Sequence, residues 1–303
     1  MTIETRRLGR TGADVTILGY GAMELRGQPH GPAISDDDAG RLLGEVLDGG
    51  INLIDTSIDY GRSEELIGRY LGHRRDEYFL ASKCGCPLDL PTDTPPPYPH
   101  DYRSANVRAG VEQSLRRLGT DRLDLVQVHM SPSREQMAAE DTIETLASVR
   151  EEGKTRFIGM SGILPNLPDH IAMGVFDVFQ IPYSVVQREH EDLITTAAQA
   201  GAGTLIRGGA ARGGPAEDKN WAQGPLGLPP GEGQRRWESA DMDDLLGGMP
   251  RLEFVLRFTL SHPGLSSTIV GTSSVEHLRA NLAVARKGPL PADLYDKARQ
   301  YLG

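Results

Sequence analysis

Short apolar runs alternate along the chain with segments whose apolar residues recur at helical spacing. Residues 51–54 form one such run and predict a strand, and Leu43, Val46 and Leu47 predict the buried face of the helix before it. The same signals predict strands at residues 17–21, 51–54, 78–81, 123–128, 156–159, 178–181, 204–206 and 267–270. They predict helices that begin after Ser35 and at residues 63–71, 104–118, 141–151, 165–173, 189–200, 250–260 and 275–285. Because strands that alternate with helices pair in parallel through right-handed crossovers, eight such units favour a closed (β/α)8 TIM barrel over an open sheet.

Four other segments complete this α/β chain, which we expect to form one domain over all 303 residues. Residues 6–15 predict an N-terminal β-hairpin, and residues 291–303 predict a short terminal helix. Long connections follow the third and seventh strands, at residues 84–101 and 208–248. Connections of this length are functional lids or surface ornaments, and the pattern leaves both interpretations open.

Composition narrows the class of protein. Of the residues, 38% are hydrophobic and 24% are charged, which is typical of a soluble globular enzyme. Lys and Arg number 32 against 42 Asp and Glu, a formal charge of −10, and no basic run offsets it, so we expect no nucleic-acid partner. No apolar stretch is long enough to cross a bilayer, and the first residues do not resemble a signal peptide. We therefore expect a cytoplasmic protein without membrane association.

Cysteine usage agrees with that location. The two cysteines, Cys84 and Cys86, cannot form a disulfide framework, and reduced thiols are usual in the cytosol. Because the sequence shows no further ligands near them, we predict no metal site.

Four residues with acid–base chemistry stand at or just past the ends of three consecutive predicted strands. They are Asp55, Tyr60, Lys83 and His129. A parallel barrel gathers the carboxyl ends of its strands around one mouth, so we expect these side chains to meet there. A tyrosine beside a lysine, with an acid and an imidazole at hand, can protonate a carbonyl oxygen. Taken singly, each has a structural alternative, such as a helix cap for Asp55 or a satisfied histidine for His129.

Three spaced motifs resemble the aldo-keto reductase superfamily. They are GINLIDTSIDYGRSEELIG at residues 50–68, LDLVQVH at residues 123–129 and GKTRFIGMS at residues 153–161. Several motifs in the right order are far more specific than any one alone. The resemblance runs from the opening hairpin to Asn281 and implies a bacterial-type, short-tailed TIM-barrel enzyme that reduces an aldehyde or ketone to an alcohol.

The resemblance also implies a role for each of the four residues. Tyr60 would be the general acid that protonates the carbonyl oxygen, and Lys83 would lower its pKa by stabilising the phenolate. Asp55 would pair with Lys83, and His129 would orient the carbonyl and donate a hydrogen bond to the developing oxyanion. The hydride would come from a nicotinamide, since no side chain can deliver one.

The cofactor contacts of the family map onto several strand ends. The implied cofactor-binding residues are Gly21, Ala22, Met23, Asp55, Ser161, Gln180, Arg207, Gly208, Gly209, Gly271, Thr272, Ser273, Ser274, His277 and Asn281. Two positions depart from the family, with Gly162 where an asparagine is usual and Arg207 where an aromatic usually stacks. The basic residues usual near Ser273 are also absent, although Arg279 or a protonated His277 can substitute. From the preference of the family we expect NADP(H), with NAD(H) as the alternative.

A substrate pocket is expected above Tyr60 and His129. Its implied residues are Met23, Tyr60, Tyr98, His129, Trp221 and Trp237. Such a pocket suits an aromatic or apolar carbonyl compound and offers equally good stacking faces to a sugar ring. Two other functions stay open, an NAD-dependent sugar or polyol dehydrogenase of the same fold and a cofactor-binding regulatory subunit without turnover.

Overall fold

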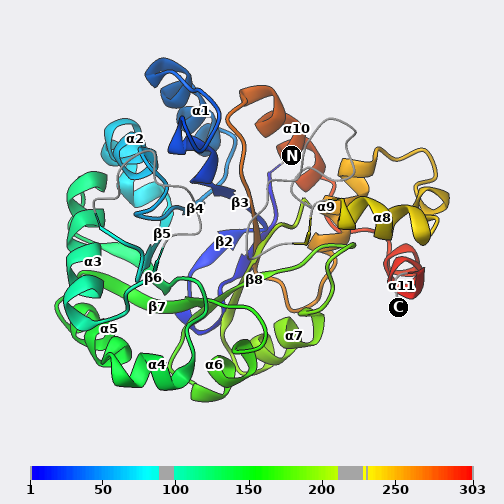
Figure 1. Cartoon of the computed structure of the whole chain (residues 1–303). Helices are drawn as coiled ribbons and strands as arrows, with labels where there is room; N and C mark the ends of the chain where they lie inside the picture. Colours follow the sequence, from blue (N-terminus) through cyan, green and yellow to red (C-terminus); the bar gives the residue numbers. More distant parts are fainter. Residues whose placement is uncertain (1, 89–98, 211–227, 230, 302–303) are drawn as a thin grey trace.

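A closed barrel of parallel strands forms the centre of the molecule. The computed structural model describes residues 2–88, 99–210, 228–229 and 231–301. Within these residues, eight strands close the barrel in the spatial order β10-β3-β4-β5-β6-β7-β8-β9 (Figure 1). They are β3 (Leu18–Gly21), β4 (Leu53–Asp55), β5 (Phe79–Cys84), β6 (Leu123–Val128), β7 (Thr155–Ser161), β8 (Val178–Pro182), β9 (Gly203–Arg207) and β10 (Ser267–Val270). The predicted (β/α)8 TIM barrel is confirmed.

Helices surround the barrel (Figure 1). The α-helices are α1 (Asp36–Asp48), α2 (Ser63–Leu71), α3 (Ser104–Leu118), α4 (Arg134–Ala139), α5 (Thr142–Glu151), α6 (Leu167–Met173), α7 (Glu191–Gln199), α8 (Glu232–Ser239), α9 (Arg251–Leu260), α10 (Val275–Ala285) and α11 (Ala292–Tyr301). Short 3₁₀ helices are η1 (Gly9–Thr11), η2 (Ala22–Arg26), η3 (Gly72–Glu77) and η4 (Met242–Leu245). Ser35 caps α1 as expected, because its hydroxyl accepts a hydrogen bond from the Asp38 amide at 3.1 Å. In the part of the chain that the structure describes, no helix has both the length and the apolar character needed to cross a bilayer.

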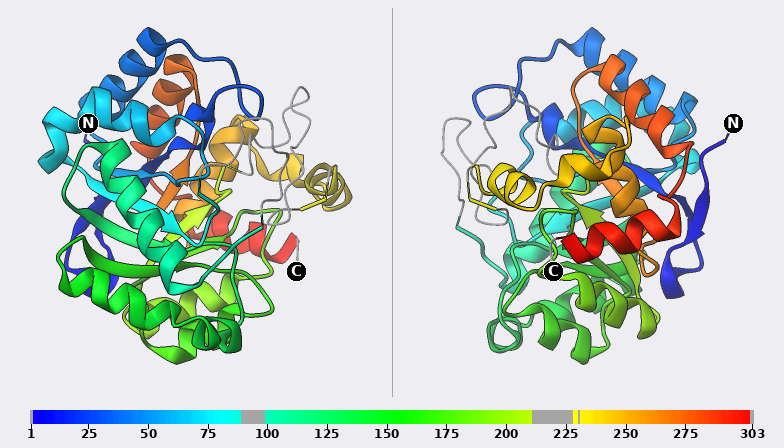
Figure 2. Two further views of the ribbon diagram at one scale, coloured as in Figure 1. Left: turned by 60° about the vertical axis from the view of Figure 1, so that its left-hand side comes forward. Right: turned by 90° about the vertical axis from the view of Figure 1, so that its right-hand side faces the viewer.

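A short antiparallel hairpin covers one end of the barrel. It consists of β1 (Thr5–Arg7) and β2 (Asp14–Thr16), joined through η1. Leu8 and Val15 are fully buried in one cluster with the interior residues Leu53, Phe79, Ala81, Leu125, Val178 and Leu205. Figure 2 shows the hairpin on the side of the molecule opposite to α8. The amino-terminal end of the barrel is therefore packed with apolar side chains.

The interior face of the barrel changes from apolar to polar along its strands. Side chains on one face of a strand recur every second residue. Two positions after the apolar interior residues Leu53, Ala81, Leu125 and Val178 come Asp55, Lys83, Gln127 and Gln180. Each of these four polar side chains belongs to a residue that is at most 2% exposed. Strand register sets Lys83 directly beside Gln127. A buried polar layer thus lies at the carboxyl ends of the strands.

Among the strands and α-helices, three differences from the sequence-based expectation are larger than a boundary shift of one or two residues. β5 continues to Cys84, so Lys83 lies inside the strand and not after it. α4 was not expected, because only Met137 is buried among its six residues and leaves no periodic signal. α8 lies within the second long connection, and its buried residues, Gly233 and Trp237, are too few to mark a helix in the sequence.

Candidate active site

A buried ion pair between Lys83 and Asp55 lies at the centre of the polar layer. The Lys83 Nζ donates hydrogen bonds to Asp55 Oδ2 at 2.7 Å and to the Thr56 carbonyl at 2.8 Å. The amides of Gln127 and Gln180 each donate to Asp55 Oδ1 at 2.8 Å. Burial works against the Lys83 cation, but the negative charge of Asp55 and its hydrogen bond to Nζ outweigh burial and raise the pKa of Lys83. The ammonium group is therefore charged and fixed in position.

Tyr60 lies in a turn just after β4, held between two neighbouring segments. Its amide donates to the Ser57 carbonyl at 3.1 Å, and its carbonyl accepts from the Ser63 amide at 2.9 Å. The next residue, Gly61, has a φ of +47°, and a Cβ there would lie 2.4 Å from the Arg26 carbonyl oxygen. Only glycine fits such a position, where η2 passes against the turn. The turn places the Tyr60 ring so that its centroid is 4.9 Å from the Lys83 Nζ.

The environment of Tyr60 keeps its phenol protonated. Burial raises the pKa of Tyr60, the Lys83 cation lowers it, and Asp55, Asp59 and Cys86 raise it further. The net direction is upward, which differs from the expectation that Lys83 alone would bring it down. The sequence could not show that the Tyr60 side chain is half-buried beside two carboxylates. A phenol in this setting holds its proton at neutral pH and is equipped to donate it.

His129 follows β6 and is held at its backbone by a second aromatic residue. The Tyr102 hydroxyl donates to the His129 carbonyl at 2.7 Å. The His129 ring is edge-on to Tyr60, with 6.5 Å between ring centroids. Burial lowers the pKa of His129 to about 3, against the attraction of Asp59, and the charge on Lys83 adds to the lowering. The imidazole is therefore neutral at pH 7 and carries one ring proton.

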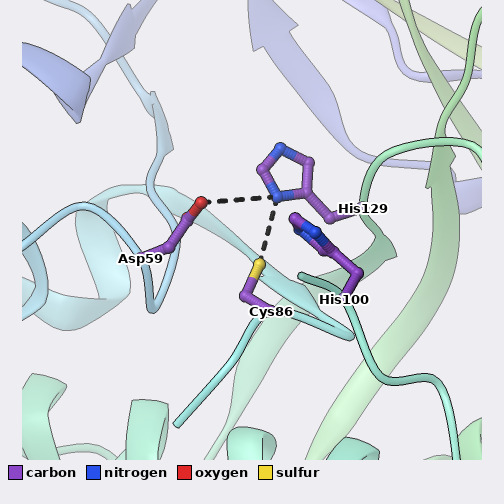
Figure 3. Close-up of side chains that lie close together, drawn as sticks. All are labelled: Asp59, Cys86, His100 and His129. Atoms are coloured by element: carbon purple, nitrogen blue, oxygen red, sulfur yellow. Dashed lines mark hydrogen bonds and ion pairs between the residues drawn. The ribbon is translucent and has the colours of Figure 1, made fainter. Parts of the chain in front are cut away.

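Three residues that the sequence analysis did not select surround the same imidazole. Figure 3 shows Asp59, Cys86 and His100 converging on His129. The His129 Nδ1 lies 3.1 Å from the Cys86 Sγ and 3.8 Å from the Asp59 Oδ2. The His100 ring is 5.3 Å from the His129 ring, measured between centroids. Cys86 therefore does have possible ligands nearby, which corrects the reasoning behind the prediction of no metal site. They escaped notice because three separate connections bring them together.

Comparisons with known proteins identify the family of the chain. A model of the Aldo/keto reductase family matches residues 17–302, nearly the whole chain. The chain belongs to the aldo/keto reductase family.

Individual relatives of this aldo/keto reductase align over most of their length. L-galactose dehydrogenase from Arabidopsis thaliana is 32% identical over 296 residues, which cover 93% of this chain and 88% of that protein. The uncharacterized oxidoreductase YqkF of Bacillus subtilis (strain 168) is 28% identical, over 92% of this chain and 90% of its own. The holo form of aldo-keto reductase AKR11C1 from Bacillus halodurans superposes with a TM-score of 0.83 at 28% identity, covering 99% of this chain and 96% of that chain. The names of these relatives support the conclusion that the chain is an oxidoreductase.

The cofactor contacts implied for this aldo/keto reductase begin where β3 and β10 end. A Cβ on Gly271 would lie 2.7 Å from the Gly21 carbonyl oxygen, so the two backbones approach too closely for a side chain. The Tyr20 hydroxyl donates to the Thr272 carbonyl at 2.8 Å. The positions of Gly21 and Gly271 are therefore adjacent in space, with Ala22 and a half-buried Met23 following in η2.

Further implied contacts lie at the ends of β7, β8 and β9, the last of which pairs with β10. The Ser161 hydroxyl is 3.4 Å from Gln180 Oε1, so Ser161 is linked through Gln180 to Asp55. Arg207 is half-buried at the end of β9, and its charge helps to lower the pKa of His129. Gly208 and Gly209 follow, and the Gly209 carbonyl accepts from the Thr259 hydroxyl at 2.7 Å. The structure thus links Ser161 and Gln180 to Asp55, and it sets Arg207 close enough to His129 to act on its charge.

A pocket of about 850 Å³ lies between α1 and the start of α10. Ser273, Ser274 and Arg279 line it, together with Asp38, Glu45 and Asp48. The Ser274 hydroxyl accepts from the His277 amide at 3.3 Å, which is ordinary helix capping. His277 is exposed and Asn281 is buried. The Arg279 guanidinium donates two hydrogen bonds to Glu45, at 2.9 and 3.1 Å.

Trp237 does not line a pocket. The side chain is fully buried in the hydrophobic core, edge-on to Phe254 at 6.0 Å between ring centroids. Its Nε1 donates to Asp243 Oδ1 at 3.0 Å. Trp237 therefore packs α8 against α9, which corrects its assignment to the substrate pocket. Tyr98 and Trp221, the other aromatic residues expected there, lie outside the described residues.

Proposed function

We propose that this aldo/keto reductase reduces an aldehyde or ketone to an alcohol with NAD(P)H, and that Tyr60 supplies the proton. The observation that carries the proposal is the buried Lys83–Asp55 pair beneath Tyr60, with Nζ 4.9 Å from the ring centroid. A buried ion pair is expensive to maintain unless its remaining hydrogen bonds are satisfied. Here Gln127, Gln180 and the Thr56 carbonyl satisfy them. A fixed ammonium group in this position is suited to stabilising a phenolate on Tyr60.

The proposed chemistry assigns one task to each residue. When bound, the nicotinamide supplies a hydride to the carbonyl carbon. Tyr60 donates its phenolic proton to the carbonyl oxygen, and the Lys83 ammonium stabilises the phenolate that forms. Asp55 keeps Lys83 charged and aimed. Neutral His129 orients the carbonyl through the proton on Nε2, which stays there when the Cys86 thiol donates to Nδ1.

The groups present fit a dinucleotide along the same edge of the barrel. Gly21 and Gly271 allow close approach of backbone to ligand, and the hydroxyls and amides at the start of α10 can receive an anionic group. Ser161 and Gln180 would hold its carboxamide. We retain NADP(H) as the first candidate, with Arg279 as the residue that would turn from Glu45 to a 2′-phosphate.

One observation favours a second candidate, the NAD-dependent oxidation of a sugar. Arg279 already pairs with Glu45, and Arg41, the other arginine that lines this pocket, already pairs with Asp38. A 2′-phosphate would also meet Asp48 on the pocket wall. NAD(H), which lacks that phosphate, avoids the repulsion. A relative named L-galactose dehydrogenase is consistent with a sugar substrate.

The test compares binding and turnover in one series. The protein is titrated with NADPH and with NADH, and the cofactor that binds is used to screen carbonyl compounds and sugars. Tyr60→Phe should lose more than about 1,000-fold in kcat with little change in cofactor affinity, because only proton transfer is removed. The matched control is Tyr70→Phe on α2, which should behave as wild type.

Three outcomes would each count against the proposal. Unchanged turnover in Tyr60→Phe would remove Tyr60 from the chemistry. Tight cofactor binding without turnover on any substrate would favour a regulatory subunit. If the protein bound neither NADPH nor NADH, the proposed oxidoreductase activity would be ruled out.

A further inference from the structure

We propose that Asp59, Cys86, His100 and His129 form a binding site for a Zn²⁺-like transition-metal ion at the barrel mouth. Each of the four residues offers one ligand atom, and these atoms all lie within 4.8 Å of one another. One carboxylate oxygen, one sulfur and two imidazole nitrogens is a donor set that Zn²⁺ accepts in proteins. Figure 3 shows the four side chains directed toward a common point.

The spacing is close to what a tetrahedral ion requires. With metal–ligand bonds of about 2.0–2.3 Å, ligand atoms around Zn²⁺ stand roughly 3.3–3.8 Å apart. The Cys86 Sγ and the His129 Nδ1 are 3.1 Å apart, and the Asp59 Oδ2 is 3.8 Å from that nitrogen. Movements of about 1 Å or less would complete the tetrahedron, which small rotations of side chains can supply.

The backbone holds these ligands independently of any metal. Gly85 has a φ of +84°, and a Cβ there would lie 2.4 Å from the Tyr102 ring. This turn separates the two cysteines, so Cys84 packs in the hydrophobic core and Cys86 reaches His129. The Asp101 amide donates to the Gly85 carbonyl at 2.9 Å. That bond fixes the chain next to His100 against the cysteine turn.

Second-layer hydrogen bonds hold Asp59 and His129 in the same way. The Ser57 hydroxyl donates to Asp59 Oδ1, which leaves Oδ2 facing His129. The Tyr102 hydroxyl holds the His129 carbonyl. The side chains of Asp59 and His129 are each only 8% exposed. Such outer contacts are typical of protein metal sites, where they orient the ligands before the ion arrives.

The donor set also predicts which ions bind. Mg²⁺ and Ca²⁺ prefer oxygen ligands, and the cluster offers one carboxylate, so we expect neither to compete. Zn²⁺, Co²⁺ and Cd²⁺ accept sulfur and imidazole nitrogen. Binding requires the Cys86 thiolate, so one proton passes from Cys86 to solvent for each ion bound. The thiolate and the Asp59 carboxylate together balance the charge of the divalent ion.

The test is a metal titration of the reduced, tag-free, chelator-treated protein in the absence of substrate and cofactor. We expect one Zn²⁺ per chain by calorimetry, with proton release, and a sulfur-to-cobalt charge-transfer band when Co²⁺ is used. Cys86→Ser and His100→Asn should each weaken Zn²⁺ binding by about tenfold or more, and Cys86→Ser should abolish the band. The matched controls are Cys84→Ser, which removes a thiol in the core, and His73→Asn on η3, which removes an exposed imidazole.

The outcomes are decisive either way. Retained binding in both controls and weakened binding in both cluster variants would establish the site. Wild-type protein that binds Zn²⁺ no better than Mg²⁺ would overturn it, as would a charge-transfer band that disappears with Cys84 and survives in Cys86→Ser. If Cys86→Ser does not fold, His100→Asn decides the question, because His100 is only half-buried. None of these readouts depends on turnover, so they do not depend on the proposed function.

Discussion

At the scale of single residues, the Lys83–Asp55 pair has both a proposed role in the reaction and a role in stability. The two side chains are 0% and 3% exposed, so neither charge can be left without the other at low cost. Removing one partner of a buried pair leaves an uncompensated charge, whereas removing both can be nearly neutral. Variants at this pair therefore separate the chemical role of Lys83 from its structural role.

Lys83→Met is expected to lower the free energy of unfolding by about 3–5 kcal/mol, because Asp55 is left charged and buried. Turnover should fall to background in the same variant. The double variant Asp55→Asn/Lys83→Met should recover most of the stability and none of the turnover. Urea unfolding and cofactor oxidation measure the two effects. A double variant that regains turnover would show that the ammonium group is not needed for the reaction.

His129 makes the protein sensitive to acid. Its pKa is about 3 in the folded protein and near its ordinary value of 6.5 in the unfolded chain. Between these values the unfolded chain binds a proton that the folded protein does not, so stability is complete above about pH 6.5 and falls as the pH drops. We expect wild type to lose about 2 kcal/mol more than His129→Asn between about pH 7 and pH 4.5. Urea titrations at both pH values test this, with His73→Asn as the control. Equal losses in wild type and His129→Asn would contradict it.

The sequence predicted that Asp55 and Lys83 meet because they stand at the ends of adjacent strands, and the structure brings the two side chains together. Asp55 and Lys83 stand two positions beyond apolar interior residues, so their alternation points into the barrel. The same signal was available for Gln127, whose amide holds Asp55, but glutamine carries no acid–base chemistry to draw attention. Asp59 and His100 lie in connections, where no periodicity fixes the direction of a side chain. Their meeting with His129 depends on turns that only the folded chain specifies.

At the scale of elements, the sequence predicted those that present a continuous apolar face. α3, β6, β10 and α10 have the expected boundaries. α4 and α8 were missed because each rests on one large buried side chain, Met137 and Trp237 respectively. An element held by a single contact leaves little trace in the sequence. It should also be the easiest to detach.

Trp237→Ala is expected to release α8 from the barrel. Truncating a buried tryptophan costs about 3–5 kcal/mol, and α8 has few other buried contacts to compensate. The loss should appear as faster cleavage between α8 and η4 in limited proteolysis, because local unfolding exposes this segment first. Trp237→Phe, which keeps an aromatic ring against Phe254, should be cleaved at an intermediate rate. Cleavage of Trp237→Ala at the wild-type rate would show that other contacts hold α8.

At the scale of the whole molecule, the hairpin and the polar layer divide the barrel into two ends with different tasks. The apolar end contributes packing, and the polar end carries the proposed reaction. Leu8→Ala is expected to lower the free energy of unfolding by about 2–5 kcal/mol, because it opens a cavity between the hairpin and the barrel. kcat/KM should be unchanged, because the hydrophobic cluster that contains Leu8 includes none of the proposed catalytic residues. A variant that keeps its stability but loses activity would refute this division.

The apolar packing around Leu8 and Val15 also affects how ligands can enter the barrel. Apolar side chains close one end of the barrel. A ligand that contacts the Lys83–Asp55 pair would therefore enter and leave at the other end. When two ligands enter through the same opening, the one that binds deeper is expected to bind first and to dissociate last. If the proposed function holds, the hairpin would thereby influence the order in which cofactor and substrate bind, although it lies at the other end of the barrel.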